Sequence, residues 1–277
     1  MDNNNKEKFH ENYIEGRNAV LEAFRSGKTI DKLFVLDGCQ DGPIKSITRE
    51  ARKHDAIINY VAKERLDQMS ETGKHQGVIA VSAAYEYAEV SDILENAERK
   101  GEPPFIIILD GIEDPHNLGA IIRTANQAGA HGIIIPKRRA VGLTPTVAKT
   151  SAGAINYTPV AKVTNISNTI KELKEKGMWF VCADMGGTTM YDLNLTGPIG
   201  LVIGNEGDGV SKLVKENCDM TASIPMVGDI DSLNASVATG VLAYEIVRSE
   251  EHSLNSSPCR GMSGVYYELY IYRIGSI

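Results

Sequence analysis

The segment that determines the expected fold is residues 105–136, FIIILDGIEDPHNLGAIIRTANQAGAHGIIIP. Its first five residues, 105–109, are all apolar, which is typical of a β-strand buried on both faces. A helix is expected over 117–128, where Gly129 ends it, and a second apolar strand follows at 132–135. Strand, helix and strand in this order predict an open α/β fold with a parallel sheet.

The same alternation continues on both sides of this stretch. Downstream, strands are expected at 178–182, 200–203 and 220–224, and helices at 144–152, 166–176, 210–217 and 232–248. Upstream, a smaller α/β unit is expected, with strands at 33–36, 56–61 and 77–82 and helices at 17–25 and 43–54.

The pattern predicts two domains and two further segments. The domains are expected at 1–85 and 104–252, and an acidic linker that contains a short helix joins them at 86–103. The tail at 253–277 does not continue the pattern. A disordered extension, an added strand and the scar of a frameshift all remain open for it.

The composition is that of an ordinary folded chain, with 277 residues, 42% hydrophobic and 23% charged. The net charge of −7 excludes a nucleic-acid binder that relies on bulk positive charge, although Lys137, Arg138 and Arg139 form a local basic cluster. No apolar run approaches the roughly 20 residues that cross a membrane, and the polar N-terminus does not read as a secretory signal. Because the four cysteines lie far apart and no histidine has metal-ligand spacing, we expect no metal site and a reducing, cytoplasmic location.

Three segments follow predicted strands, at the edge where open α/β sheets bind ligands. In the first, DGIEDPHNLGAIIR at 110–123, Asn117 stands at the expected helix start and Arg123 lies six residues later in an otherwise apolar helix. Asn117 is either a helix N-cap or a ligand-binding amide. Arg123 either extends into solvent or meets an anion.

The second segment is LVIGNEGDG, at 201–209, and the third is IPMVGDIDSLNASVA, at 224–238. Three glycines in the second let the backbone approach a ligand closely, and a carboxylate in such a loop, Glu206, favours a functional role. In the third, Ser232 and Asn234 could simply cap the last helix, although an amide there also suits a ligand.

Together these segments resemble the three motifs of the SpoU (TrmH-type) family of RNA ribose 2′-O-methyltransferases, in the SPOUT superfamily. The matching residues are Asn117-x-Gly119-x-x-x-Arg123, then Gly204-Asn205-Glu206-Gly207-x-Gly209, then Ile224-Pro225-Met226 followed by Ser232-Leu233-Asn234-x-Ser236-x-Ala238. Residues 14–20 and 75–80 resemble the substrate-binding domain of the RlmB-type subgroup, which methylates a guanosine of large-subunit ribosomal RNA.

This resemblance implies a fold, a cofactor and partners. The second domain would be a parallel-sheet SPOUT domain whose C-terminal part forms a trefoil knot, preceded by a small L30e-like domain that binds RNA. The protein would be a homodimer that uses S-adenosylmethionine and acts on RNA, with no membrane partner and no metal.

The resemblance also implies site residues. It assigns catalysis and substrate binding to Asn117, Arg123, Glu206, Ser232 and Asn234, and cofactor contacts to Gly204, Ile224 and Leu233. The neighbouring residues Leu201, Ile203 and Met226 complete the expected cofactor site because they lie at the same strand ends.

The family assigns activation of the ribose hydroxyl to the arginine that matches Arg123. Since a guanidinium stays protonated at neutral pH, we expect Arg123 to bind a phosphate and to lower the pKa of the ribose hydroxyl by its charge. Three alternatives remain: a transfer-RNA target, a non-catalytic RNA-binding or ribosome-assembly protein of the same fold, and a nucleotide-binding enzyme such as a dehydrogenase. The presence of Arg123 and Asn234 speaks against the second, and the glycine spacing speaks against the third.

Overall fold

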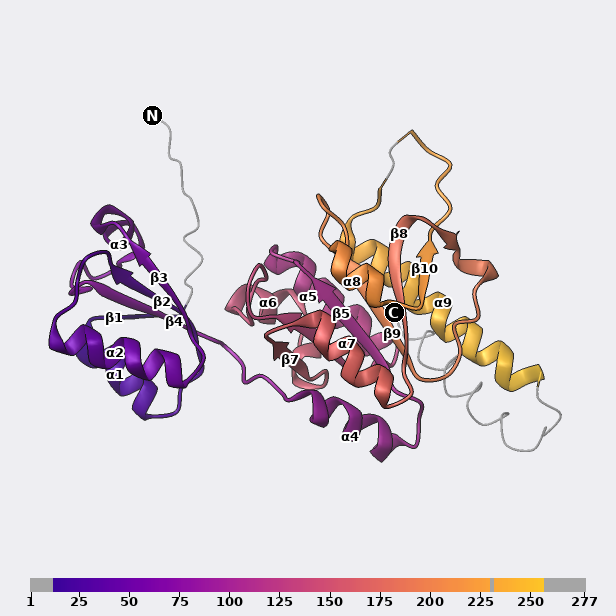
Figure 1. Ribbon diagram of the computed structural model, residues 1–277, viewed down its shortest axis with the longest axis horizontal. Helices are drawn as coiled ribbons and strands as arrows, with labels where there is room; N and C mark the ends of the chain where they lie inside the picture. The colour runs from indigo at the N-terminus through magenta and orange to yellow at the C-terminus, as the bar shows by residue number, and fades with distance from the viewer. Residues whose placement is uncertain (1–11, 230–231, 257–277) are drawn as a thin grey trace.

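A computed structural model describes residues 12–229 and 232–256. The described chain contains two sheets, and Figure 1 shows them as separate bodies joined by a connecting segment. Residues 1–11, 230–231 and 257–277, which include most of the expected tail, lie outside the described part.

The first sheet has four strands, β1 (Tyr13–Glu15), β2 (Ile30–Leu36), β3 (Ile57–Val61) and β4 (Val78–Ser82). Their order is β1-β4-β2-β3, and only the β2–β3 pair is parallel. Helices α1 (Arg17–Arg25) and α2 (Gly42–Lys53) bury apolar side chains against one face, while α3 (Lys63–Met69) packs Leu66 against Ile79 on the other.

The second sheet has six strands, all parallel, in the order β10-β8-β9-β5-β6-β7. These strands are β5 (Phe105–Asp110), β6 (Gly132–Pro136), β7 (Val160–Val163), β8 (Trp179–Thr189), β9 (Ile199–Gly204) and β10 (Met220–Ser223). The expected parallel α/β sheet is therefore confirmed, and β5 lies inside it between β9 and β6.

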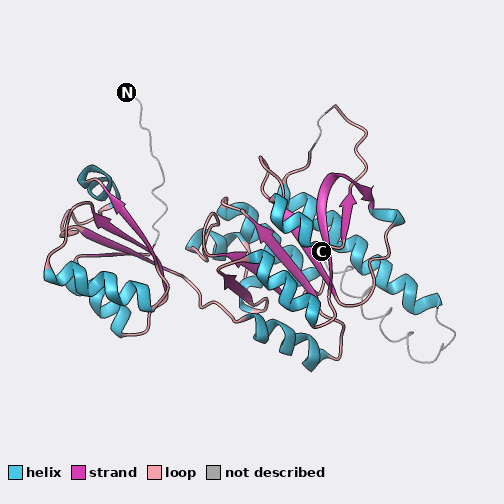
Figure 2. Ribbon diagram, viewed as in Figure 1, coloured by secondary structure: helices cyan, strands magenta, loops and turns pink. Residues whose placement is uncertain are grey.

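Helices cover both faces of this sheet, as Figure 2 shows. One face packs against α5 (Pro115–Gln127), α6 (Pro145–Thr150) and α9 (Ala235–Ser256), and the other against α4 (Val90–Lys100), α7 (Ile166–Glu175) and α8 (Lys212–Asn217). Along β5, Ile107 and Leu109 point to the first face, and Ile106 and Ile108 to the second. This alternation explains why β5 reads as a continuous apolar run.

The segment 86–103, expected as a linker, is packed against the second sheet. It contains α4, whose Ile93 is fully buried and leaves no room for a Cβ on Gly132. The short helix is therefore part of the core of the second domain. None of the described helices is long and apolar enough to cross a membrane.

Other elements differ from the sequence pattern in extent. Strand β8 continues to Thr189, beyond the expected end at 182, and α9 begins at Ala235 and runs to Ser256. The pattern also misses β1, α3 and β7, which are three, seven and four residues long. Two 3-10 turns, η1 (Ala154–Asn156) and η2 (Met190–Asp192), complete the described elements.

Candidate active site

The loops that follow β5 and β9 meet at the carboxyl edge of the second sheet. These neighbouring strands pair in register, so that Asp110 lies opposite Gly204 where both strands end. Asp110 Oδ2 accepts a hydrogen bond of 2.8 Å from the backbone N–H of Ser211, which ties the second loop to the end of β5. The first two predicted motifs are thereby brought together.

Three polar side chains form a cluster at this edge. Asn117 Nδ2 donates a hydrogen bond of 2.5 Å to Glu206 Oε1. Asn234 Nδ2 donates to the same oxygen over 2.8 Å and to Asn117 Oδ1 over 3.0 Å. We call these three residues the amide–carboxylate cluster; one residue comes from each of the three motifs.

The structure decides between the roles left open for the two asparagines. Asp114 caps α5, because its Oδ1 accepts a hydrogen bond from the backbone N–H of His116, and Asn117 is 7% exposed inside the first turn. Asn234 has both roles, since its Oδ1 accepts from the backbone N–H of Ser236 while its Nδ2 serves the cluster.

A cavity of about 260 Å³ opens beside the cluster. Predicted site residues that line it are Ile203, Gly204, Glu206, Ile224, Met226, Ser232 and Leu233. Leu201 is not among the lining residues, because it lies three positions inside β9 and is fully buried in the apolar core.

Gly204 sits where the loop folds back on itself. A Cβ at this position would lie 2.0 Å from the carbonyl carbon of Gly209 and 2.2 Å from the nitrogen of Val210. Asn205 Oδ1 accepts hydrogen bonds from the backbone N–H groups of Gly207 and Asp208, which fixes the turn. The glycine is therefore required by close packing of the backbone at the cavity wall.

The sequence pattern misses one ionised group of the cavity, Asp184 on the extended part of β8. The Lys215 ammonium lies 2.8 Å from Asp184 Oδ2 and, together with the backbone N–H of Gly186, holds the pKa of that carboxyl below its usual range. Asp184 therefore stays charged at neutral pH. The run Asp-Met-Gly-Gly reads as a turn in the sequence, which hid the strand that carries it.

Comparisons with known proteins agree with this geometry. A model of the SpoU rRNA Methylase family matches residues 104–244, and a model described as RNA 2′-O ribose methyltransferase substrate binding matches residues 13–88. The chain belongs to the SpoU methyltransferase family. It is an RNA methyltransferase of the TrmH/SpoU type, and this family uses S-adenosylmethionine.

Individual relatives of this SpoU methyltransferase cover most of its length. YacO of Bacillus subtilis, named as a candidate TrmH family tRNA/rRNA methyltransferase, is 51% identical over 238 residues, which are 85% of this chain and 95% of YacO. A Staphylococcus saprophyticus protein with the same family name is 46% identical over 240 residues, or 86% of this chain and 96% of that protein.

Solved structures share the architecture. The SpoU methyltransferase AviRb from Streptomyces viridochromogenes, in complex with AdoMet, aligns with a TM-score of 0.54 and 25% identity over 85% of this chain and 89% of AviRb. An AdoMet-bound rRNA methyltransferase from Sinorhizobium meliloti shows the same fold, with a TM-score of 0.52 and 24% identity over 85% of this chain and 86% of that one.

The cavity of the SpoU domain fits S-adenosylmethionine by its chemistry. Apolar side chains of Ile203, Ile224 and Leu233 offer surfaces for an adenosine, and Gly204 lets the loop at the cavity wall pack tightly on its own backbone. The carboxylates of Asp184 and Glu206 line the same cavity and suit a ligand that carries a sulfonium charge.

Arg123 lies apart from the amide–carboxylate cluster. It is exposed on α5 and makes no hydrogen bond or ion pair with any residue in the described part of the chain. Arg123 lies on the same exposed side of α5 as His116, seven residues earlier, whereas Asn117 faces the interior of the domain. The guanidinium is thus free to bind an anion that arrives from solvent.

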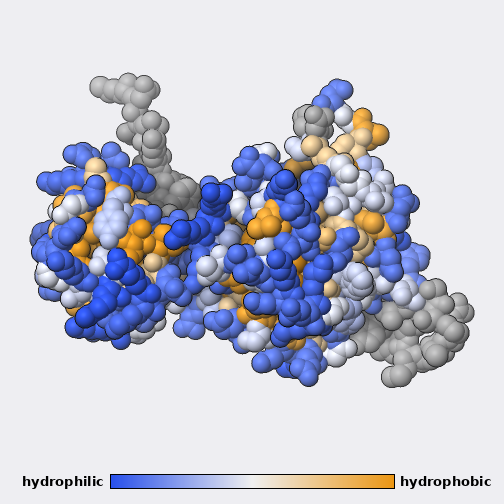
Figure 3. Space-filling view, viewed as in Figure 1, coloured by the Kyte–Doolittle hydropathy of each residue, from blue (hydrophilic) through white to orange (hydrophobic). Residues whose placement is uncertain are grey.

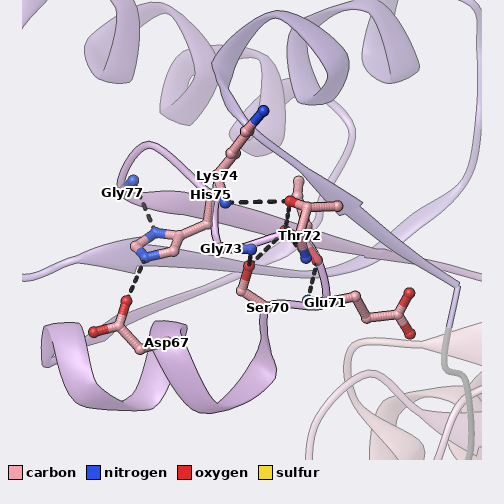
Figure 4. Close-up of polar contacts among 9 residues, drawn as sticks. Asp67, Ser70, Glu71, Thr72, Gly73, Lys74, His75 and Gly77 are labelled. Carbon is pink, nitrogen blue, oxygen red and sulfur yellow. Dashed lines mark hydrogen bonds and ion pairs between the residues drawn. The ribbon is translucent and has the colours of Figure 1, made fainter.

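The two motifs of the substrate-binding domain meet in one ordered loop, residues 70–77, drawn in Figure 4. Glu15 accepts hydrogen bonds of 2.6 Å from Ser70 Oγ and from Thr72 Oγ1. Further along, His75 Nδ1 accepts from the backbone N–H of Gly77, and its Nε2 lies 2.9 Å from Asp67 Oδ1. Hydrogen bonds to Glu15 and Asp67 therefore hold this loop against the rest of the domain.

Replacing Glu206 with alanine should slow methyl transfer about 100-fold, because both cluster amides lose the acceptor that orients them. Glu206→Gln, which keeps one oxygen at that position, should lose about tenfold. Single-turnover methylation measures both rates, with Glu216→Ala, which removes an exposed carboxylate of α8 outside the cavity lining, as the matched control. Equal rates for Glu206→Ala and the control would contradict a role for this carboxylate.

Proposed function

We propose that this SpoU methyltransferase methylates the ribose 2′-hydroxyl of a guanosine in large-subunit (23S) ribosomal RNA, in the cytoplasm. The observation that carries the proposal is the amide–carboxylate cluster at the mouth of the cavity, where three motifs distant in sequence contribute one side chain each. Glu206 lines the cavity, and Glu206 and Asn234 are both exposed, so a substrate can reach this side of the cluster.

S-adenosylmethionine supplies an electrophilic methyl group when it is bound in the cavity. The chain must then hold a ribose hydroxyl in line with that methyl and lower the pKa of the hydroxyl. Asn117 and Asn234 orient the ribose through their amides, with Glu206 fixing both, and Ser232 lies at the cavity wall where it can contact the same group. Arg123 binds the adjacent phosphate of the RNA and stabilises the developing alkoxide by its charge.

Support for ribosomal RNA comes from the separate substrate-binding domain, which suits a structured RNA read by shape and by loop bases. A transfer-RNA target is the alternative, since the relatives are named for both substrates. The test is to incubate the chain with labelled S-adenosylmethionine and, in separate reactions, total ribosomal RNA and total transfer RNA. We expect label in a guanosine of 23S RNA; label confined to transfer RNA would overturn this choice.

We also propose that the protein is a homodimer formed through its SPOUT domains, with the C-terminal trefoil knot that the family resemblance implies. On α9, Val237 and Tyr244 are 50% and 46% exposed and share one side with the half-buried Val241. Leu242 and Ile246 of the same helix are instead buried in the core of their own domain. An exposed apolar stripe of this kind suits a second copy.

Light scattering should report twice the 30.1 kDa mass of one chain at micromolar concentration. Val237→Glu combined with Tyr244→Glu should shift the species to a monomer, because two charges would be buried in the interface. Leu213→Glu, at an exposed position of α8, is the control and should leave the dimer intact. A wild-type chain that scatters as a monomer would refute the dimer.

A further inference from the structure

The two domains face each other across a cleft of about 450 Å³. One wall carries Lys32 and Ile57 of the substrate-binding domain, and the other includes Glu113, His116, Lys137 and Arg139 of the methyltransferase domain. Figure 3 shows hydrophilic residues, in blue, beside the junction of the two bodies on the face that it presents. The cofactor cavity and the amide–carboxylate cluster do not use this cleft.

The cleft is positively charged although the chain is acidic overall. Lys32 and Arg139 form no ion pair with any described residue, whereas Lys137 binds Asp55 across the domain boundary over 2.9 Å. Glu113 is the one acidic residue among those lining the cleft. With a net charge of −7 for the whole chain, unpaired cations on both walls indicate selective attraction of an anion.

The cleft leads to the methyl-transfer site. Pro115 and His116 open α5 and directly precede Asn117 of the amide–carboxylate cluster. The backbone N–H of Val141 donates to the carbonyl of Ile112 over 2.9 Å, so the wall that carries Arg139 is attached to the loop before α5. A polyanion lying in the cleft would therefore continue toward the cluster.

A buried polar network joins the two walls. Lys162 Nζ lies 2.6 Å from Asp31 Oδ1 and 4.6 Å from the ring centre of Tyr87. The Tyr87 hydroxyl donates to Asp31 Oδ2 over 3.0 Å and accepts from the backbone N–H of Leu143. Asp31 belongs to the substrate-binding domain and Lys162 to β7 of the other domain, and their side chains are only 8% and 14% exposed.

The two domains are closely packed at this network, where no side chain fits at Gly142. A Cβ on Gly142 would lie 2.2 Å from Asp31 Oδ2 and 2.8 Å from the Tyr87 hydroxyl. Asp31 is also the direct neighbour of Lys32 on β2, so its ion pair places the cation of the first wall. Removal of either partner of this buried ion pair would leave an uncompensated charge between the domains.

We propose that the cleft binds the phosphate backbone of the RNA strand next to the target ribose, and that Asp31, Lys162 and Tyr87 hold its walls at a fixed spacing. The inference rests on the proposed function for the direction of the strand, but RNA binding in the cleft can be measured without methyl transfer. Lys32 and Arg139 bind the phosphates, and the three network residues are positioning residues.

The first test combines Lys32→Ala with Arg139→Ala and measures binding of in vitro transcribed large-subunit ribosomal RNA over a range of salt. The slope of log Kd against log salt should fall by about 0.7 to 0.9 for each phosphate that is no longer neutralised, and the affinity by about tenfold or more. Lys45→Ala with Arg49→Ala removes the same charges from the exposed side of α2 and should leave the slope nearly unchanged.

Equal decreases in affinity for the cleft variant and the α2 variant would overturn the proposal, because they would reduce the effect to net charge. A wild-type chain that does not bind this RNA would overturn it too. A third result is that the wild type binds this RNA, the cleft variant binds it more weakly than the α2 variant does, and the wild type does not methylate it. This result would support RNA binding in the cleft and refute the proposed function. The two failures are therefore distinguishable.

The second test is Tyr87→Phe, which removes only the hydroxyl that contacts Asp31 and Leu143. A positioning role predicts a KM for RNA that rises about fivefold or more, with kcat at saturating RNA and the Kd for S-adenosylmethionine unchanged. A role in stability alone would lower the thermal midpoint without moving KM. An unchanged KM would overturn the positioning role.

Discussion

Arg123→Ala should slow methyl transfer by roughly a thousandfold, with the affinity for S-adenosylmethionine unchanged. The guanidinium is exposed and unpaired within the described residues, so its charge is available to a phosphate of the substrate. Because it lies outside the cavity lining, its removal should not disturb cofactor binding. Arg123→Lys keeps the charge but loses the planar fork, and we expect a rate about tenfold lower.

Single-turnover methylation of a short RNA hairpin, beside a cofactor titration, separates the two effects. Gln127→Ala, four residues further along the exposed side of α5, is the matched control. An alanine variant of Arg123 that methylates at nearly the wild-type rate would remove the arginine from the mechanism. The assignment of the cofactor site would not be affected by that result.

Gly204→Ala should weaken S-adenosylmethionine binding by about 100-fold or more, because the added side chain reshapes the cavity wall. The new Cβ would meet the backbone of Gly209 and Val210 at 2.0 to 2.2 Å, so the loop that forms the wall must shift. Gly228→Ala is the control, because nothing lies within 4 Å of the Cβ that it adds. Calorimetry gives the affinities, and circular dichroism shows whether each variant is folded.

A second variant keeps this test decisive if Gly204→Ala does not fold. Leu233 is 37% exposed and lines the same cavity, so Leu233→Asp should fold and still lose cofactor affinity. Unchanged affinity in folded Gly204→Ala, or in Leu233→Asp, would show that the cofactor binds elsewhere.

Much of the site could be predicted because it lies at strand ends. The apolar run at 105–109 predicts a central parallel strand, and parallel strands bring the loops that follow them to one edge. Asn117, Glu206 and Asn234 meet there, as a shared site requires. The pattern also indicates the cap role of Asn234, which the structure shows beside its place in the cluster.

Other features depend on contacts that a sequence pattern does not contain. Leu201 belongs to the same apolar run as Ile203, but only the residues at the end of β9 reach the cavity. Asp184 lies on a strand that continues through two glycines by pairing with β10. The interdomain ion pair of Asp31 and Lys162 joins residues 131 positions apart, so no local sequence pattern predicts it.

The position of the transferred methyl group is the most direct test of the ribose chemistry assigned to this site. The chain is incubated with S-adenosylmethionine labelled in its methyl group and with large-subunit ribosomal RNA, and the RNA is then hydrolysed with alkali. A 2′-O-methyl group blocks cleavage at its own nucleotide, so we expect label in alkali-stable dinucleotides for the wild type and, in the same short incubation, almost none for Arg123→Ala. Label released in mononucleotides would place the methyl group on a base and would contradict methylation of the ribose.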